Sequence, residues 1–152
     1  MDGARGVVES LIEAANRHDL DGIVASFSDD VVSETPAHPA RSFHGSGQIR
    51  ANWSQILGAV KDFRAVIVSA TTGPSRVVGG TEVWAELAFD GTKPDGTPLR
   101  LRGVTVNDVV AGRIASLRFY LEPVDSEGLS PDVAVRAALG VGRDARPAGV
   151  DR

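Results

Sequence analysis

The sequence predicts an α+β fold in which a curved antiparallel sheet wraps around three N-terminal helices and a short extra helix follows near the C-terminus. Up to Leu57, apolar residues recur every three or four positions, as they do along one face of a helix. From Phe63 the spacing changes to two, which is typical of strands with one buried face. Helices followed by a long run of strands favour α+β over an alternating α/β fold.

Each N-terminal helix has an apolar face and a boundary signal. The first is expected to end at His18–Asp19, the second to be capped by Asp19 or Asp21, and the third by Ser46. Their apolar faces carry Val7, Val8, Leu11, Ile12 and Ala15; Ile23, Val24 and Phe27; and Ile49, Trp53, Ile56 and Leu57. A short strand over 31–35 is expected between the second and third helices, with a loop over 36–47.

Four longer strands are predicted over 63–70, 76–89, 98–110 and 113–121. The segments 92–97 and 111–112 separate the later strands and are rich in hairpin-turn residues. We therefore place one domain over residues 1–125 and a C-terminal extension over 126–152. Within the extension we predict a helix over about 131–139, with Ser130 and Pro131 as its start signal and Gly140 as its end. Disorder is expected beyond it.

Composition excludes several classes of function. Of 152 residues, 42% are hydrophobic and 24% are charged, as in an ordinary globular domain. The net charge of −4 argues against a nucleic-acid partner. The chain has no Cys and only three His, without a His-x-x-x-His pair, so no metal site or cofactor is expected. No apolar run approaches the ~20 residues of a membrane span or forms a signal peptide, which predicts no membrane partner and a cytoplasmic location.

Two short motifs resemble a known superfamily. Residues 18–24 (His-Asp-Leu-Asp-Gly-Ile-Val) and 112–114 (Gly-Arg-Ile) are similar to segments of the SnoaL-like and ketosteroid-isomerase-like branch of the nuclear transport factor two-like superfamily. The resemblance covers about residues 5–122. It implies a cone-shaped sheet around an apolar cavity, commonly in a homodimer, and activities that include isomerisation, polyketide cyclisation, epoxide hydrolysis and plain binding.

The family's catalytic groups do not carry over to this chain. At the positions of the ketosteroid isomerase general base and oxyanion-hole groups stand Thr35, Leu11 and Thr105. At the positions of the catalytic residues of limonene-type epoxide hydrolases stand Phe119, Val83, Ala85, Ser33 and Thr35. A threonine hydroxyl is a poor base at neutral pH. The resemblance therefore implies the cavity without either of these two catalytic sets.

Strand alternation, anchored on this resemblance, predicts which side chains face the cavity. The predicted substrate-binding residues are Thr35, Trp53, Val83, Ala85, Leu87, Thr105, Asn107, Leu117, Phe119 and Leu121. The opposite face is expected to carry aromatic and charged residues, with Glu86 paired to Arg102 or Arg118, and to form the homodimer interface. A one-residue bulge would instead turn Glu86 and Glu122 into the cavity.

Two residues are candidates for acid–base catalysis. His38 lies in the loop expected at the cavity mouth, and histidine titrates near neutral pH. Glu122 lies at the end of the last long strand, before Pro123. The alternative interpretations are an exposed loop histidine and a surface acid.

The sequence thus supports two functional hypotheses. The first is a SnoaL-like enzyme, an isomerase, cyclase or hydrolase, that acts on a hydrophobic small molecule. The alternative is a non-catalytic binding protein for an apolar small molecule. The resemblance favours the enzyme, because catalysis is frequent in the family, whereas the missing catalytic groups favour binding.

Overall fold

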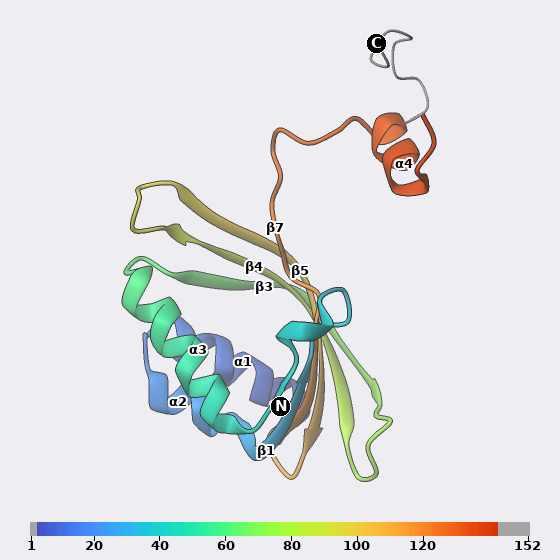
Figure 1. Ribbon diagram of the computed structural model, residues 1–152. Helices are drawn as coiled ribbons and strands as arrows, with labels where there is room; N and C mark the ends of the chain where they lie inside the picture. Colours follow the sequence, from blue (N-terminus) through green and yellow to red (C-terminus); the bar gives the residue numbers. More distant parts are fainter. Residues whose placement is uncertain (1–2, 143–152) are drawn as a thin grey trace, which may run out of the picture.

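The computed structural model describes residues 3–142 as one cone-shaped sheet with three helices on its inner side (Figure 1). The helices are α1 (Gly3–Asn16), α2 (Leu20–Ala25), α3 (Ser46–Ala59) and α4 (Pro131–Leu139), with a 3₁₀ turn η1 at Pro39–Arg41. The strands are β1 (Phe27–Glu34), β2 (Phe43–His44), β3 (Arg64–Pro74), β4 (Thr81–Thr92), β5 (Pro98–Val110), β6 (Arg113–Phe119) and β7 (Glu122–Pro123).

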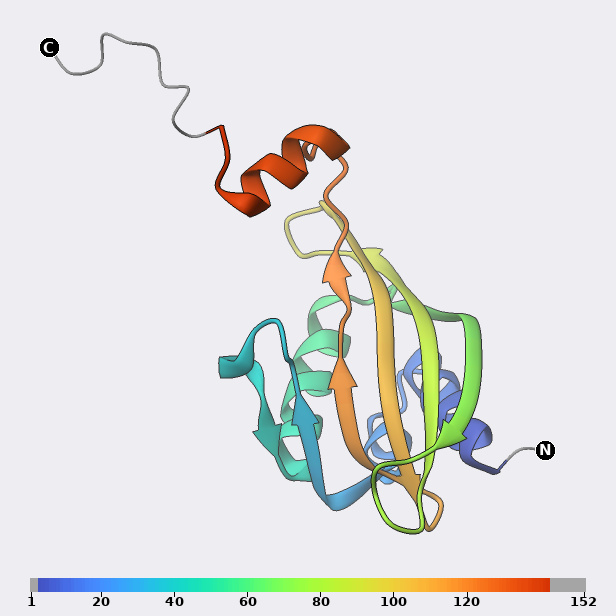
Figure 2. The same ribbon diagram turned by 90° about the vertical axis from the view of Figure 1, so that its right-hand side faces the viewer.

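The sheet has the order β2-β1-β6-β5-β4-β3, and β7 extends the line of β6 beside β5 (Figure 2). The predicted α+β cone is confirmed. Neighbouring strands are antiparallel except β1 and β6, which are parallel, so the sheet is mixed. The two motifs of the family resemblance lie close together in the fold. Ile114, in the second motif, donates its N–H to the carbonyl of Ser26, two residues after the first motif, over 2.8 Å.

The corner between α1 and α2 explains the first motif. His18 adopts a left-handed conformation (φ 56°), which ends α1. Asp19 then caps α2, because its Oδ1 accepts a 3.0 Å hydrogen bond from the Gly22 amide. A Cβ on Gly22 would lie 3.1 Å from the Ala14 side chain and would collide with the Asp19 carboxylate. Only a glycine therefore lets the two helices meet this closely.

Asn16, the last residue of α1, joins the helix layer to the sheet. Its Nδ2 donates to the Ala65 carbonyl over 2.9 Å, and its Oδ1 accepts from the Ala65 amide over 2.7 Å. The side chain thereby occupies both backbone groups of one β3 residue, as a neighbouring strand would. This contact fixes where α1 sits across the inner face.

Gly103 lies where β5 passes from its pairing with β6 to its pairing with β7. Its φ of +154° is rarely adopted by residues with a side chain. A Cβ at this position would lie 2.8 Å from Leu121 Cα and collide with the Tyr120 carbonyl oxygen. This close approach of β5 to the segment after β6 therefore needs a glycine.

Several boundaries differ from the sequence-based expectation. Phe27 begins β1 instead of continuing α2, because pairing with β6 recruits residues from 27 onward. β4 begins at Thr81 and not at residue 76, so 75–80 form the hairpin loop. A separate β7 follows β6, and the expected C-terminal helix is α4.

The outer face of the sheet carries most of the buried charge. Arg118 lies 3.2 Å from Glu82 and 3.8 Å from Asp108, and Asp108 accepts a 2.6 Å hydrogen bond from Ser75. The Trp84 indole N–H donates to Glu82, and with Arg118 it holds the pKa of Glu82 below its ordinary 4.5 despite burial. The expected pairing of Glu86 with Arg102 or Arg118 is not formed; Arg102 pairs with Asp90 at 3.1 Å.

The chain leaves the body of the fold after β7. In both views α4 projects away from the sheet and the other helices (Figures 1 and 2). Its apolar residues stay exposed, Val135 at 58% and Leu139 at 72%. The tail for which disorder is expected lies outside the described residues, apart from its first positions.

Candidate functional site

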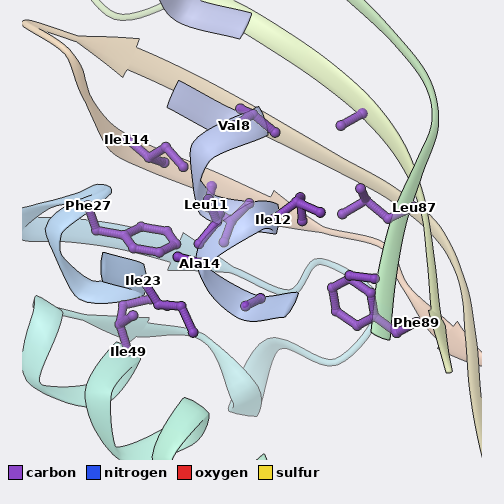
Figure 3. Close-up of a cluster of buried hydrophobic side chains, with 14 of the residues drawn as sticks. Val8, Leu11, Ile12, Ala14, Ile23, Phe27, Ile49, Leu87, Phe89 and Ile114 are labelled. Atoms are coloured by element: carbon purple, nitrogen blue, oxygen red, sulfur yellow. The ribbon is translucent and has the colours of Figure 1, made fainter. Parts of the chain in front are cut away.

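A cavity of about 250 Å³ lies between the inner face of the sheet and helices α1 and α3. The helices contribute Val8, Leu11, Ile12, Ile49, Asn52, Trp53 and Ile56. The strands and the β1–β2 connection contribute Phe27, Ser33, Thr35, Arg41, Phe43, Leu87, Phe89, Leu101, Thr105, Asn107, Leu117 and Phe119. Figure 3 shows Leu11 and Ile12 of α1 facing the strand that carries Leu87 and Phe89.

Most of the residues predicted to bind substrate lie in this wall. They are Thr35, Trp53, Leu87, Thr105, Asn107, Leu117 and Phe119. The inward orientation follows from strand alternation, because Thr105 pairs with Phe119 and Asn107 pairs with Leu117 across β5 and β6.

Val83, Ala85 and Leu121 are buried in the core and do not line the cavity. Ala85 pairs with Ala70 of β3, whose carbonyl accepts a hydrogen bond from Arg5 of α1, so α1 covers this part of β4. Leu121 lies against Gly103 of β5. These side chains point inward as predicted, but other residues fill the space in front of them.

One polar group of the wall has a fully determined hydrogen-bond pattern. Asn107 Nδ2 donates to the Val83 carbonyl over 3.2 Å and to Thr105 Oγ1 over 3.0 Å. Because a carbonyl only accepts, these contacts fix which end of the Asn107 amide is nitrogen. Both amide hydrogens are then used, and Oδ1 accepts no hydrogen bond from any described residue. Within residues 3–142, every side-chain nitrogen or oxygen that is fully buried has a hydrogen-bond partner. Oδ1 has none and is therefore not fully buried, and because Asn107 lines the cavity, we take Oδ1 to be open to it.

The cavity opens beside the β1–β2 connection. Among its described lining residues, Arg41 is the only ionisable one and the only one that is largely exposed. Trp53, Phe63 and Phe89 form an edge-to-face aromatic cluster, with ring centroids 5.2–6.1 Å apart, that supports the wall between α3 and β4.

The two catalytic candidates lie next to each other but outside this wall. His38 Nε2 is 2.9 Å from Glu122 Oε1, and the two side chains are 39% and 46% exposed. Neither residue lines the cavity. Glu122 pairs with Arg102, which is exposed, and Glu86 is exposed on the outer face of β4. The one bulge between β3 and β4 lies on β3, between Ile67 and Ser69, so it turns neither acid inward.

Sequence reasoning missed several lining residues that a stricter use of periodicity finds. Asn52 and Ile56 complete the helical spacing of Ile49 and Trp53, and Leu101 continues the alternation of β5. Arg41 belongs to a connection whose path no periodicity predicts. Within residues 3–142, no group of three or more metal-binding side chains comes together, and no helix is long and apolar enough to cross a membrane.

Comparisons with known proteins agree with this architecture. The family model described as "SnoaL-like domain" matches residues 8–117. No curated protein matches the chain. RV0760c from Mycobacterium tuberculosis, solved in complex with estradiol-17beta-hemisuccinate, is similar with a TM-score of 0.64 and 23% identity over 79% of this chain and 94% of that chain.

Two further solved structures are similar. One is a computationally designed 17-OHP binder, with a TM-score of 0.63 and 25% identity over 79% of this chain and 93% of that one. The other is an LEH-like epoxide hydrolase from M. tuberculosis, with a TM-score of 0.61 and 22% identity over 79% of this chain and 82% of that one. The fold therefore accommodates both binding and catalysis.

Proposed function

We propose that this chain, which belongs to the SnoaL-like domain family, binds a small apolar molecule in its cavity and does not transform it. The observation that carries the proposal is the composition of the wall. Thirteen of the nineteen lining residues have hydrophobic side chains, and the others are hydroxyls, amides and Arg41. Such a wall binds a ligand by burying apolar surface and orients it with a few hydrogen bonds.

The same composition argues against proton-transfer chemistry inside the cavity. Isomerisation, cyclisation and epoxide hydrolysis each need a general acid or base within hydrogen-bond reach of the reacting atom. The described lining residues offer no carboxylate and no imidazole for that task. Two of the similar folds, RV0760c and the designed 17-OHP binder, were solved with or made for steroid-type ligands, which supports a hydrophobic ligand class.

Thermal denaturation with a panel of steroids, terpenoids and aromatic polyketides tests the proposal. A ligand at about 100 times its Kd stabilises a domain by about 2.7 kcal/mol, which raises Tm by roughly 5–10 °C at this size. Ile56→Trp puts a larger side chain into the cavity wall and should abolish the shift. Gln55→Trp, on the exposed face of the same helix, is the matched control and should retain it. Recovery of the ligand unchanged by mass spectrometry supports binding without chemistry.

Acid–base catalysis at the cavity mouth is the second candidate function, and the His38–Glu122 contact of 2.9 Å favours it. A carboxylate that holds an imidazole in one orientation is a common way to prepare a general base. If a panel ligand is isomerised, cyclised or hydrolysed, His38→Ala and Glu122→Gln should abolish turnover and leave ligand-induced stabilisation intact. His44→Ala, an exposed histidine nearby, is the control. Full turnover in both variants would remove this candidate.

We also propose a homodimer formed through the outer face of the sheet. Unlike the inner face, this face is covered by none of α1, α2 and α3 (Figure 1). Trp84 and Tyr120 are 46% and 41% exposed there, and aromatic residues are enriched at protein interfaces. Light scattering after gel filtration should give twice the chain mass. Trp84→Lys and Tyr120→Lys should give the monomer, whereas Gln55→Lys on the helix side should not.

A further inference from the structure

We infer that the cavity selects an apolar ligand that carries a hydroxyl group, and that Thr105 and Asn107 bind this hydroxyl. The inference rests on the proposed function and adds the chemical class of the ligand. Thr105 and Asn107 are 6% and 2% exposed, so a ligand group that reaches them gives up its contacts with water. The hydrogen bonds that they offer then decide which groups bind.

The pair offers one acceptor and one donor. Asn107 donates both amide hydrogens, one to the Val83 carbonyl and one to Thr105 Oγ1, so only its Oδ1 is left to contact the ligand, as an acceptor. Thr105 Oγ1 accepts the hydrogen bond from Asn107, which leaves its own hydroxyl hydrogen to be donated into the cavity. Oδ1 is bonded to the same carbon as the nitrogen that contacts Thr105. One ligand atom can therefore reach both groups.

A hydroxyl is the smallest group that donates and accepts through a single oxygen. It accepts from the Thr105 hydroxyl and donates to Asn107 Oδ1. A ketone can accept from Thr105 but leaves Asn107 Oδ1 desolvated and unpaired, and a hydrocarbon leaves both groups unpaired. An unpaired buried acceptor weakens binding about tenfold or more.

The wall next to Thr105 and Asn107 is apolar, which keeps water from pairing with the Asn107 Oδ1 that a bound ketone leaves unpaired. Asn107 lies beside Leu117 on the neighbouring strand, and Phe119 lies beside Thr105 in the same way. Both side chains line the cavity on the β6 side of the polar pair. On the β4 side, Asn107 and Thr105 pair with the buried Val83 and Ala85, so the pair has apolar neighbours on both adjacent strands.

Matched compounds that differ only in the oxygen test the inference. Two sets are used: borneol, camphor and bornane, and 2-indanol, 2-indanone and indane. Calorimetric titration of the whole chain should give a Kd for each alcohol about tenfold or more below that of its ketone. The hydrocarbon should bind no better than the ketone. In a crystal of the borneol complex, the ligand oxygen should contact Thr105 Oγ1 and Asn107 Oδ1.

Variants separate this role from a structural one. Asn107→Leu removes the acceptor and should reduce the alcohol-to-ketone preference to about twofold or less, mainly through tighter ketone binding. Thr105→Ser retains the hydroxyl and should retain the preference. If Asn107→Leu does not fold, the wild-type ratios and the complex structure decide.

The possible failures are distinct. Equal affinity for alcohol, ketone and hydrocarbon in the wild type, or a ligand oxygen directed to the mouth, overturns the hydroxyl selection and leaves apolar binding intact. No measurable binding of any of the six compounds, together with no hit in the wider panel, overturns the proposed function and this inference with it.

Discussion

Gly103 provides the sharpest test of how this sheet is built, because the structure predicts a large cost for adding one methyl group. In Gly103→Ala the new Cβ meets backbone atoms of Tyr120 and Leu121. These residues join β6 to β7, both of which pair with β5, and the Tyr120 amide donates to the Val104 carbonyl, so this backbone cannot easily move away. The unusual φ of +154° adds backbone strain. Strain of about 1–3 kcal/mol and a steric cost of about 1–3 kcal/mol together predict a loss of about 2–6 kcal/mol.

Two other glycines supply matched controls for the same substitution. Gly96 also has a positive φ, +86°, but no heavy atom lies within 4 Å of its Cβ position, so Gly96→Ala should cost only about 1–2 kcal/mol of strain. Gly58 lies in α3 with equally open surroundings, so Gly58→Ala should stabilise the protein by about 0.5 kcal/mol through helix propensity.

Urea denaturation followed by far-UV circular dichroism measures all three values on one scale. The expected order of stability is Gly58→Ala above wild type, then Gly96→Ala, then Gly103→Ala. Thr105 and Leu101, on either side of Gly103, line the cavity, so ligand-induced stabilisation should also fall in Gly103→Ala. If Gly103→Ala were within about 0.5 kcal/mol of Gly96→Ala, the close approach of β5 to the segment after β6 would not be what requires glycine.

Three further substitutions follow from individual contacts. Asn16→Ala removes both hydrogen bonds that join α1 to β3 and should lower the free energy of unfolding by about 1–3 kcal/mol in urea titrations; no loss would show that packing alone positions α1. Glu82 has a pKa lowered below 4.5, first by the hydrogen bond from Trp84. The ionised Glu82 stabilises the folded state fully above the unfolded-state pKa, and this stabilisation is lost as pH falls through the folded-state pKa. Glu82→Gln should therefore flatten the decline in the free energy of unfolding below about pH 4.5. Equal slopes in the variant and the wild type would contradict this. Asn107→Asp places a carboxyl against the Val83 carbonyl in an apolar wall, which raises the pKa of the new acid. This variant should be most stable at low pH and lose stability as pH rises. A wild-type dependence of stability on pH would contradict the buried geometry.

How much could be predicted from the sequence depended on whether a feature was periodic. The inward positions of β4 and β5 repeat every second residue, so Leu87, Thr105 and Asn107 could be placed in the wall. On β6 the alternation is interrupted between Ile114 and Ser116, and both Ile114 and Leu117 turn inward as a result. Counting by twos from Phe119 would wrongly turn the exposed Arg113 inward. A bulge is a tertiary adjustment of two paired strands, and neither strand specifies it alone.

The β1–β2 connection shows the same limit for the site. Its sequence identified His38 as a candidate and gave no reason to choose Arg41, yet Arg41 lines the cavity and His38 turns to Glu122. They are three positions apart in a turn that has no repeating geometry. Its path depends on the Pro39–Arg41 turn and on the short β2, which pairs with β1 at Phe43 and His44. Which loop side chain lines the cavity is therefore decided by packing that the sequence alone does not reveal.

The chemistry of the cavity finally depends on the register of β5. Asn107 and Asp108 are consecutive and face opposite sides: Asn107 lines the cavity, while Asp108, only 2% exposed, is held on the outer side by Ser75 and Arg118. A slip of one residue would exchange them and put a carboxylate into an apolar wall, where burying an unpaired charge is costly. The slip would also break the contact of Asn107 with Val83 and would put a residue with a side chain where Tyr120 and Leu121 approach Gly103. The contacts of Asp108, the contact of Asn107 with Val83 and the position of Gly103 fix the register and so keep the acid out of the cavity, which is why a neutral, hydrogen-bonding cavity wall is the stable outcome of this sequence.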